Sequence, residues 1–311
     1  MPPVLPPSTD PSSSPSPPPH ESRIVCYHQT HYHNGKFVSI LPLLAPECGV
    51  THVIIAAIHL NASAKDITLN DDPYSAPKHD ILWQECKQLQ DSGIKVLGML
   101  GGAAKGSYAR LDGPTDRFEE FYGPLKEMIE YAKLDGLDLD VEEQMSLPGV
   151  IRLIDRLKQD FGREFIITLA PVPTGLQLFR PHLSGFSYFE LEKAFGKYIS
   201  WYNTQFYCGW GSMNSTADYE KILMCGWDPK KIVVGVVTNP GNGAGWVPDD
   251  VLCDTLSEMR DKHPESFGGV MGWEYFNSMT TSNPEEGPWA WSRLMTLIVR
   301  PHVLEGLEVE E

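Results

Sequence analysis

Short apolar or β-branched runs recur eight times along the chain, at intervals of roughly 30 to 40 residues. Most of the segments between them place apolar residues on one face of an α-helix. Strands that alternate with helices pair in parallel through right-handed crossovers, and eight such units close into a barrel. The sequence therefore predicts an α/β protein, a single (β/α)8 TIM barrel. The expected strands are 23–28, 52–60, 95–101, 136–142, 165–172, 201–207, 231–238 and 269–275, and the expected helices include 80–92, 117–134, 147–161, 218–225 and 249–263.

The barrel is expected to occupy residues 22–302, a suitable span for one large domain. Residues 1–21 are rich in Pro and Ser and cannot bury a core, so we expect an extended, disordered tail there. Residues 303–311 are acidic, and we expect a second disordered tail.

The fourth expected strand alternates apolar and acidic residues, with the two-residue period of a β-strand. Asp138, Asp140 and Glu142 therefore share one face, and Leu137, Leu139 and Val141 share the other. Three carboxylates in register repel one another, which favours a raised pKa for at least one of them. A catalytic carboxylate cluster, a solvated strand face and a cation site are all compatible with this pattern. Since the C-terminal strand ends of such a barrel carry its active site, Glu142 is well placed for catalysis.

Polar, aromatic and glycine residues also gather at the ends of other expected strands. Alternation along 201–207 sends Gln205 and Tyr207 to the same face, although a tyrosine there can equally pack in the core with a solvated hydroxyl. Trp210 and Trp246 lie in loops after the sixth and seventh strands, where each can line a groove or serve ordinary packing. The remaining strand-end candidates are Tyr27, Gly101, Gly102, Trp273 and Glu274.

The charge balance and the cysteines limit which partners and which cellular compartment are compatible with the sequence. Forty-one acidic residues against 25 basic ones give a net charge of −16, which argues against nucleic acid or a membrane surface as a partner. No apolar run is long enough for a transmembrane helix, and residues 1–20 lack the features of a secretory signal peptide. The six cysteines are scattered, as is typical of reduced thiols. We expect a cytoplasmic protein and a monomer.

No metal or cofactor site is expected from the motifs. His28, His31 and His33 cluster near the end of the first strand, but no Cys or acidic residue completes a known ligand spacing. The glycine-rich segment 241–245 lacks the Lys-Ser/Thr of a phosphate-binding loop. No serine nucleophile elbow is visible.

The pattern Asp-Gly-x-Asp-x-Asp-x-Glu, from Asp135 to Glu142, resembles the signature of glycoside hydrolase family 18. That family contains chitinases and endo-β-N-acetylglucosaminidases. The resemblance implies a retaining hydrolase in which the N-acetyl group of the substrate attacks the anomeric carbon and forms an oxazolinium ion. It implies that Glu142 is the general acid, that Asp140 orients the acetamide, and that Asp138 is hydrogen-bonded to Asp140.

The same resemblance implies roles for other residues. Tyr207 would hydrogen-bond the acetamide carbonyl, Gln205 would contact the same sugar, and Trp273 would form its floor. Residues 240–267 leave no room for the α+β insertion domain that some family-18 chitinases carry, so we expect an open groove. The further substrate-binding candidates are Tyr27, Gly101, Gly102, Glu274, Trp210 and Trp246.

Three segments resemble fungal endo-β-N-acetylglucosaminidases more than chitinases, namely 138–146, 201–207 and 268–278. Such enzymes cut N-glycans between the two GlcNAc residues of their core. A chitinase acting on GlcNAc polymers is the alternative, and a catalytically silent sugar-binding protein is the alternative of another class. The chain departs from the pattern at Glu143-Gln144, where Gln-Pro is expected. We expect Glu143 to face away from the pocket.

Overall fold

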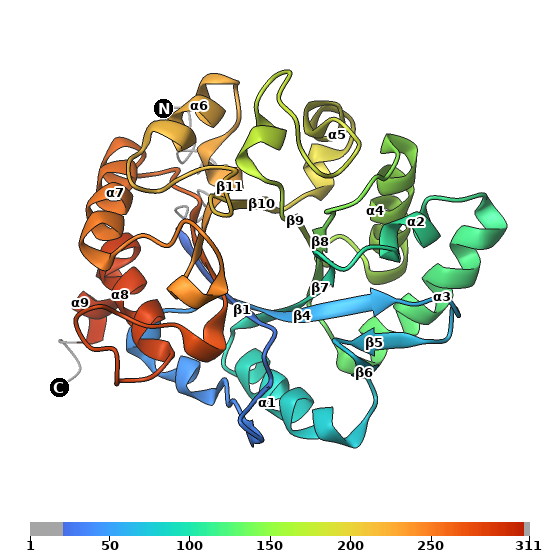
Figure 1. The fold of residues 1–311 in the computed structure, drawn as a ribbon, viewed down its shortest axis with the longest axis horizontal. Helices are drawn as coiled ribbons and strands as arrows, with labels where there is room; N and C mark the ends of the chain where they lie inside the picture. The colour runs from blue at the N-terminus through green and yellow to red at the C-terminus, as the bar shows by residue number, and fades with distance from the viewer. Residues whose placement is uncertain (1–20, 308–311) are drawn as a thin grey trace, which may run out of the picture.

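The computed structural model describes residues 21–307, in which eight parallel strands form a closed barrel. The strands are β1 (Arg23–His28), β4 (His52–Leu60), β7 (Lys95–Gly101), β8 (Gly136–Asp140), β9 (Ile166–Leu169), β10 (Trp201–Gln205), β11 (Ile232–Val237) and β12 (Gly269–Trp273). The barrel closes because β1 pairs with β12 on one side and with β4 on the other. Figure 1 looks into the ring of strands, with helices arranged around it. The predicted barrel is confirmed.

Helices surround the strands, and they include several that were not among the expected ones. They are α1 (Asp80–Asp91), α2 (Ser107–Leu111), α3 (Thr115–Ala132), α4 (Leu147–Phe161), α5 (Tyr188–Phe195), α6 (Ala217–Met224), α7 (Asp249–Lys262), α8 (Trp289–Val299) and α9 (Pro301–Leu307). Helix α9 corrects the prediction of a disordered tail from residue 303, because residues 303–307 continue a helix that packs against α8. The predicted tail of residues 1–20 and residues 308–311 lie outside the described part. Within 21–307, no helix has the length and apolar character to span a membrane.

Strand alternation divides the core into two layers. Leu137, Leu139 and Val141 point outward into the large apolar layer between the strands and the helices. A smaller cluster fills the barrel interior, with side chains such as Val25, Leu97, Met99, Val233 and Met271. Both faces of each strand are buried, so strands such as β11 form continuous apolar runs, whereas β8 alternates apolar residues with two buried aspartates. Only α7 and short turns separate β11 from β12, so the described chain has no insertion domain there.

Strand β4 is longer than its neighbours and continues into an extra hairpin. Its end pairs antiparallel with β5 (Ile67–Leu69), which in turn pairs with β6 (Asp72–Pro73). Figure 1 shows this three-stranded extension reaching outward beside the barrel. A second, two-stranded sheet joins β2 (Tyr32–His33) to β3 (Lys36–Phe37). These additions follow β1 and β4, so they lie at the same end of the barrel as the strand C-termini.

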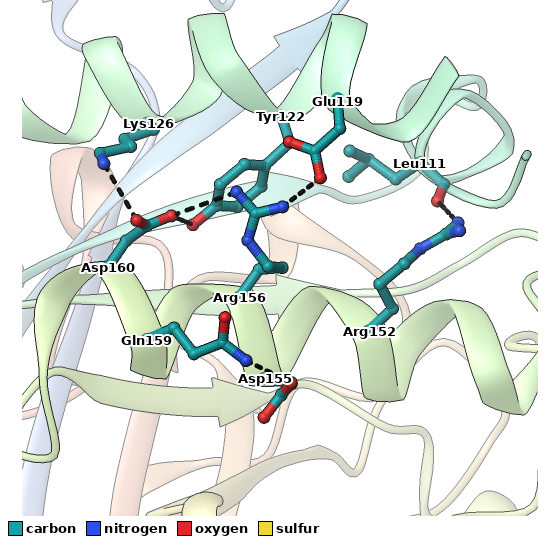
Figure 2. A network of polar contacts seen from close by, with 9 residues as sticks. All are labelled: Leu111, Glu119, Tyr122, Lys126, Arg152, Asp155, Arg156, Gln159 and Asp160. Atoms are coloured by element: carbon teal, nitrogen blue, oxygen red, sulfur yellow. Dashed lines mark hydrogen bonds and ion pairs between the residues drawn. The ribbon is translucent and has the colours of Figure 1, made fainter. Parts of the chain in front are cut away.

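A polar network joins α3 to α4, the helices that precede and follow β8 (Figure 2). The hydroxyl of Tyr122 donates to Asp160 over 2.8 Å, and Lys126 donates to the same carboxylate over 3.0 Å. Arg156 pairs with Glu119 and lies 4.8 Å from the ring centroid of Tyr122. The contacts cross from one helix to the other, so they hold together the two helices that flank the acidic strand.

Candidate active site

A cavity of about 390 Å³ opens at the C-terminal ends of the barrel strands. Side chains and backbone from β4, β7, β8, β10 and β12, or from the loops that follow them, line it. The expected site residues that line this cavity are Gly101, Gly102, Asp140, Glu142, Gln205, Tyr207, Trp210 and Trp273. Eight of the expected site residues therefore lie together at the C-terminal end of the barrel.

Asp138 lies below the cavity, fully buried among the strands. Its carboxylate accepts hydrogen bonds from the Tyr27 hydroxyl (2.8 Å), the Thr168 hydroxyl (2.5 Å) and the Asn203 amide (3.1 Å). Burial raises the pKa of Asp138, while these three donors oppose the rise.

The expected hydrogen bond from Asp138 to Asp140 is absent from the described residues. Asp138 acts on Asp140 through space, because its charge raises the pKa of Asp140. The protein instead supplies one donor from each of β1, β9 and β10.

Asp140 and Glu142 form the upper part of the acidic face. The pKa of Asp140 is raised well above its usual value by burial, then by the charges of Glu142 and Asp138. The pKa of Glu142 is raised by burial and lowered by its hydrogen bond from Gln205 and by the charge of Lys105. The charge of Glu142 acts directly on Asp140, so the pair titrates as a unit. Such a pair can hold one proton at a pH where an isolated carboxyl group has lost it.

Gln205 joins the two carboxyl groups. Its Nε2 donates to Asp140 Oδ1 over 3.0 Å and to Glu142 Oε1 over 3.3 Å, and it also donates to the backbone oxygen of Ala170 over 2.8 Å. The side chain is therefore held in one orientation, with its amide nitrogen toward the acids. The arrangement fixes the relative position of the two groups that could exchange a proton.

Aromatic side chains enclose the rest of the cavity. Trp273 lies edge to face with Tyr27, with ring centroids 5.6 Å apart. Tyr27 therefore supports both Trp273 and Asp138, and it lies beneath the cavity rather than in its lining. Burial and the charge of Asp140 raise the pKa of Tyr207 well above its usual value, so its hydroxyl stays protonated and able to donate.

Two glycines let the wall approach the acids closely. Gly101 and Gly102 have φ angles of +91° and +88°, which favour glycine. A Cβ atom on Gly101 would lie 2.5 Å from the Tyr108 ring and 2.7 Å from the backbone oxygen of Asp140. The Gly102 N–H donates to that same oxygen over 2.9 Å. These contacts explain the two glycines without a substrate.

The structure places two expected substrate contacts elsewhere. Both oxygens of Glu274 are occupied, because they accept from the backbone N–H groups of Gln29 (3.0 Å) and Thr30 (2.8 Å) and from the Thr30 hydroxyl (2.9 Å). Trp246 packs against the interior cluster and does not line the cavity. We assign both residues to the framework of the barrel.

Sequence reasoning missed several polar residues around the acids. Thr168 and Asn203 hold Asp138, and Gln29, His59 and Asn242 line the cavity. One signal was available for Asn203, because alternation from Gln205 places it on the same inward face. Thr168 is the cross-strand partner of Asp138, so finding it requires the register between β8 and β9.

The histidine cluster is organised differently from the sequence pattern. The rings of His28, His31 and His79 contact one another in series, the first pair tilted (centroids 4.9 Å apart) and the second edge to face (5.9 Å), while His33 is exposed and contacts Asn34. Both ring nitrogens of His28 and of His79 are buried without a hydrogen-bond partner. Across residues 21–307, no group of three His, Cys, Asp or Glu side chains has an arrangement that could hold a metal ion.

Known proteins share both the sequence pattern and the barrel. Residues 23–299 match the model of the family described as glycosyl hydrolases family 18. The structure of a chitinase, ChiC, from Aspergillus fumigatus is 52% identical over 89% of this chain and 99% of that chain, with a TM-score of 0.82. The structure of a fungal endo-β-N-acetylglucosaminidase from glycosyl hydrolase family 18 is 44% identical over 90% of this chain and 98% of that chain, with a TM-score of 0.84.

More distant relatives are longer proteins. Chitinase 2 of Rhizopus oligosporus is 29% identical over 209 residues, which cover 61% of this chain and 35% of that protein. Endochitinase A of Aspergillus niger is 29% identical over 221 residues, which cover 60% of this chain and 16% of that protein. The chain therefore spans about a third or less of the length of these two curated relatives.

Proposed function

The chain belongs to glycosyl hydrolase family 18, a family of glycosidases, and we propose that it is an endo-β-N-acetylglucosaminidase that cuts the GlcNAc-β1,4-GlcNAc core of N-glycans. The main support for this proposal is the set of carboxylates that line the cavity. Among the described residues that line it, Asp140 and Glu142 are the carboxylates, and both extend from β8 or just beyond it. A retaining enzyme with its own nucleophile needs a second carboxylate across the bond from the acid. We therefore propose, as the family resemblance implies, that the acetamide group of the substrate supplies the nucleophile.

The proposed mechanism assigns a role to each of these residues. Glu142 donates its proton to the glycosidic oxygen while the acetamide oxygen of the sugar attacks the anomeric carbon, so the C–O bond breaks and an oxazolinium ion forms. Asp140 accepts a hydrogen bond from the acetamide N–H and stabilises the positive charge. Tyr207 donates to the acetamide oxygen. Glu142 then takes a proton from water, which attacks the anomeric carbon, and the two inversions give net retention.

Support for an N-glycan comes from the surface beside the cavity. Two further cavities of about 490 and 460 Å³ adjoin it over the hairpin of β4, β5 and β6, and share His59 and Ala104 with its lining. Polar side chains such as Asn61, Asn70 and Asp71 line them. This polar surface provides hydrogen-bonding groups for sugars beyond the GlcNAc pair.

A chitinase acting on GlcNAc polymers is the second candidate, and the 52% identity to a fungal chitinase favours it. Incubation with a high-mannose glycoprotein, followed by intact mass measurement, separates the two. A single GlcNAc left on each processed asparagine supports the endo-β-N-acetylglucosaminidase. An unchanged glycoprotein, together with release of short oligomers from chitohexaose, supports the chitinase.

We also propose a reducing, cytoplasmic compartment. All six cysteines are free in the described chain, and burial raises the pKa of the Cys26 and Cys86 thiols. Expression of the full-length chain as a fluorescent fusion, with fractionation of cytosol and medium, tests this location. Recovery of the fusion in the medium would contradict it.

A further inference from the structure

Glu143 follows the expected general acid and points the other way. Its two carboxylate oxygens accept from the Gly106 N–H over 2.8 and 2.9 Å, and one of them also accepts from the Tyr108 N–H over 2.9 Å. The chain has glutamate here, where the family resemblance predicts glutamine. The side chain is half-buried, and its hydrogen-bonding capacity is used on the loop that follows β7.

The loop that Glu143 holds forms one wall of the cavity. Gly102, Ala103 and Ala104 line the cavity, and Lys105 follows them directly. The base of the loop is fixed independently, because Gly102 N–H donates to the Asp140 backbone oxygen. Glu143 thus holds the far end of a short wall whose near end is already attached to the acidic strand.

Helix α2 is attached to the segment after β8 at a second point. The carboxylate of Asp112, at the end of α2, accepts from the Ser146 N–H over 2.7 Å and from the Ser146 hydroxyl over 2.5 Å. The two attachments bracket α2, so each contributes to the stability of the same contact. They differ in position, since only Glu143 adjoins Glu142 and holds the cavity wall.

We propose that Glu143 is a positioning residue that fixes the wall formed by residues 102–106, and with it the backbone of Lys105, at the edge of the cavity that holds Glu142. This inference rests on the proposed role of Glu142 as the acid. Lys105 is exposed, and among the described residues its side chain forms no hydrogen bond or ion pair, so its position follows that of its backbone.

Electrostatics give this arrangement a measurable signature. The groups that face Glu142 are Asp140, Gln205 and Lys105, and the hydroxyls of Tyr188 and Tyr207 also sense its charge. Lys105 is the cation among them, and its charge lowers the pKa of Glu142. If the wall is released, the charge of Lys105 acts less strongly on Glu142, so the pKa of Glu142 rises. Because the acid acts when protonated, the high-pH limb of activity then moves to higher pH.

The test compares four variants with the wild-type chain. Glu143→Ala is expected to lower kcat about tenfold, through loss of the fixed wall, and to move the high-pH limb upward. Glu143→Gln retains near wild-type kcat, because Oε1 alone can accept from both N–H groups. Lys105→Met moves the high-pH limb of the activity profile upward in the same way, without lowering Tm. Asp112→Ala, the matched control, lowers Tm as Glu143→Ala does and leaves the limb in place.

Two results would overturn the inference. One is a wild-type kcat and pH profile in Glu143→Ala, and the other is the same limb shift in Asp112→Ala, which would indicate general loosening. Carbon-13 NMR titration of the Glu142 carboxyl group in the free protein gives a second readout that needs no turnover. An inactive wild-type chain would refute the proposed function, whereas an unchanged Glu142 titration in Glu143→Ala would refute the positioning role by itself.

Discussion

The hydroxyl of Tyr27 offers a direct test of how the buried Asp138 is stabilised. Tyr27→Phe removes one atom and keeps the ring that supports Trp273. The lost hydrogen bond is 2.8 Å long and reaches a fully buried carboxylate. Hydrogen bonds to charged groups contribute about 1.5–3 kcal/mol, so we expect a loss of about 2 kcal/mol in the free energy of unfolding at pH 7. For a domain of this size, with an unfolding entropy of about 0.6 kcal/mol per kelvin, that corresponds to a fall in Tm of about 3 °C.

The loss should depend on pH in a defined direction. The Tyr27 hydroxyl stabilises the ionised form of Asp138, so it opposes the rise in the pKa of that group. The stability difference between wild type and Tyr27→Phe is therefore largest above the pKa of Asp138 and shrinks as the pH falls through it. Urea unfolding of both proteins at a series of pH values measures this difference.

Tyr219 provides a matched control of the same chemistry. Its ring is fully buried, but its hydroxyl has no hydrogen-bond partner in the described chain. Removing an unpartnered buried hydroxyl restores the free energy spent on its desolvation, so Tyr219→Phe is expected to be neutral or stabilising by about 1 kcal/mol. Equal stability losses in Tyr27→Phe and Tyr219→Phe would refute the argument, because the effect would then not come from the bond to Asp138.

Three further predictions concern other parts of the molecule. Glu142→Gln is expected to abolish hydrolysis with an unchanged Tm, and retention of more than about one per cent of activity would remove Glu142 from its role as the acid. Burial lowers the pKa of His31 from 6.5 to about 4, so on acidification the unfolded chain is protonated before the folded one. The free energy of unfolding should therefore fall by about 3 kcal/mol between pH 6.5 and pH 4. Urea unfolding of the wild type and of His31→Gln measures this, and the variant should lose less stability over the same pH range. Arg156→Ala, in the network between α3 and α4, is expected to cost about 1 kcal/mol, whereas Lys87→Ala, which breaks an isolated surface pair, should leave Tm unchanged.

Most barrel strands were predictable because they are buried on both faces and form apolar runs, and β8 was predictable from its alternation of apolar and acidic residues. The strand ends were less accurate, since the expected strand 165–172 is only β9 (Ile166–Leu169). Helix α8 was missed for a related reason. It packs against α7 and β1, and its sequence is more apolar overall than those of the expected helices, so few polar residues mark its solvent face. Strands β5 and β6 are too short to show any period.

The acidic face was predictable because it lies within one strand, where the side-chain period fixes which residues point the same way. The partners of Asp138 were not, because they come from three other strands. Thr168 becomes its neighbour through the register of β8 and β9, and Tyr27 reaches it across the barrel. A single sequence contains no direct record of register, so it indicates the acids without the donors that hold them.

Glu142 and Glu274 show that position at a strand end is not enough to identify a catalytic residue. Each glutamate comes just after the end of a barrel strand, and both were candidates for the site. Glu274 accepts three hydrogen bonds from the loop after β1, so its oxygens are saturated and it fastens one strand end to another. Glu142 receives one hydrogen bond, shares its donor with Asp140, and has its pKa raised by burial. A carboxyl group can serve as an acid when it keeps its proton and has an unoccupied oxygen to present to the substrate. Those conditions are set by the neighbours that the fold supplies, and they favour Glu142.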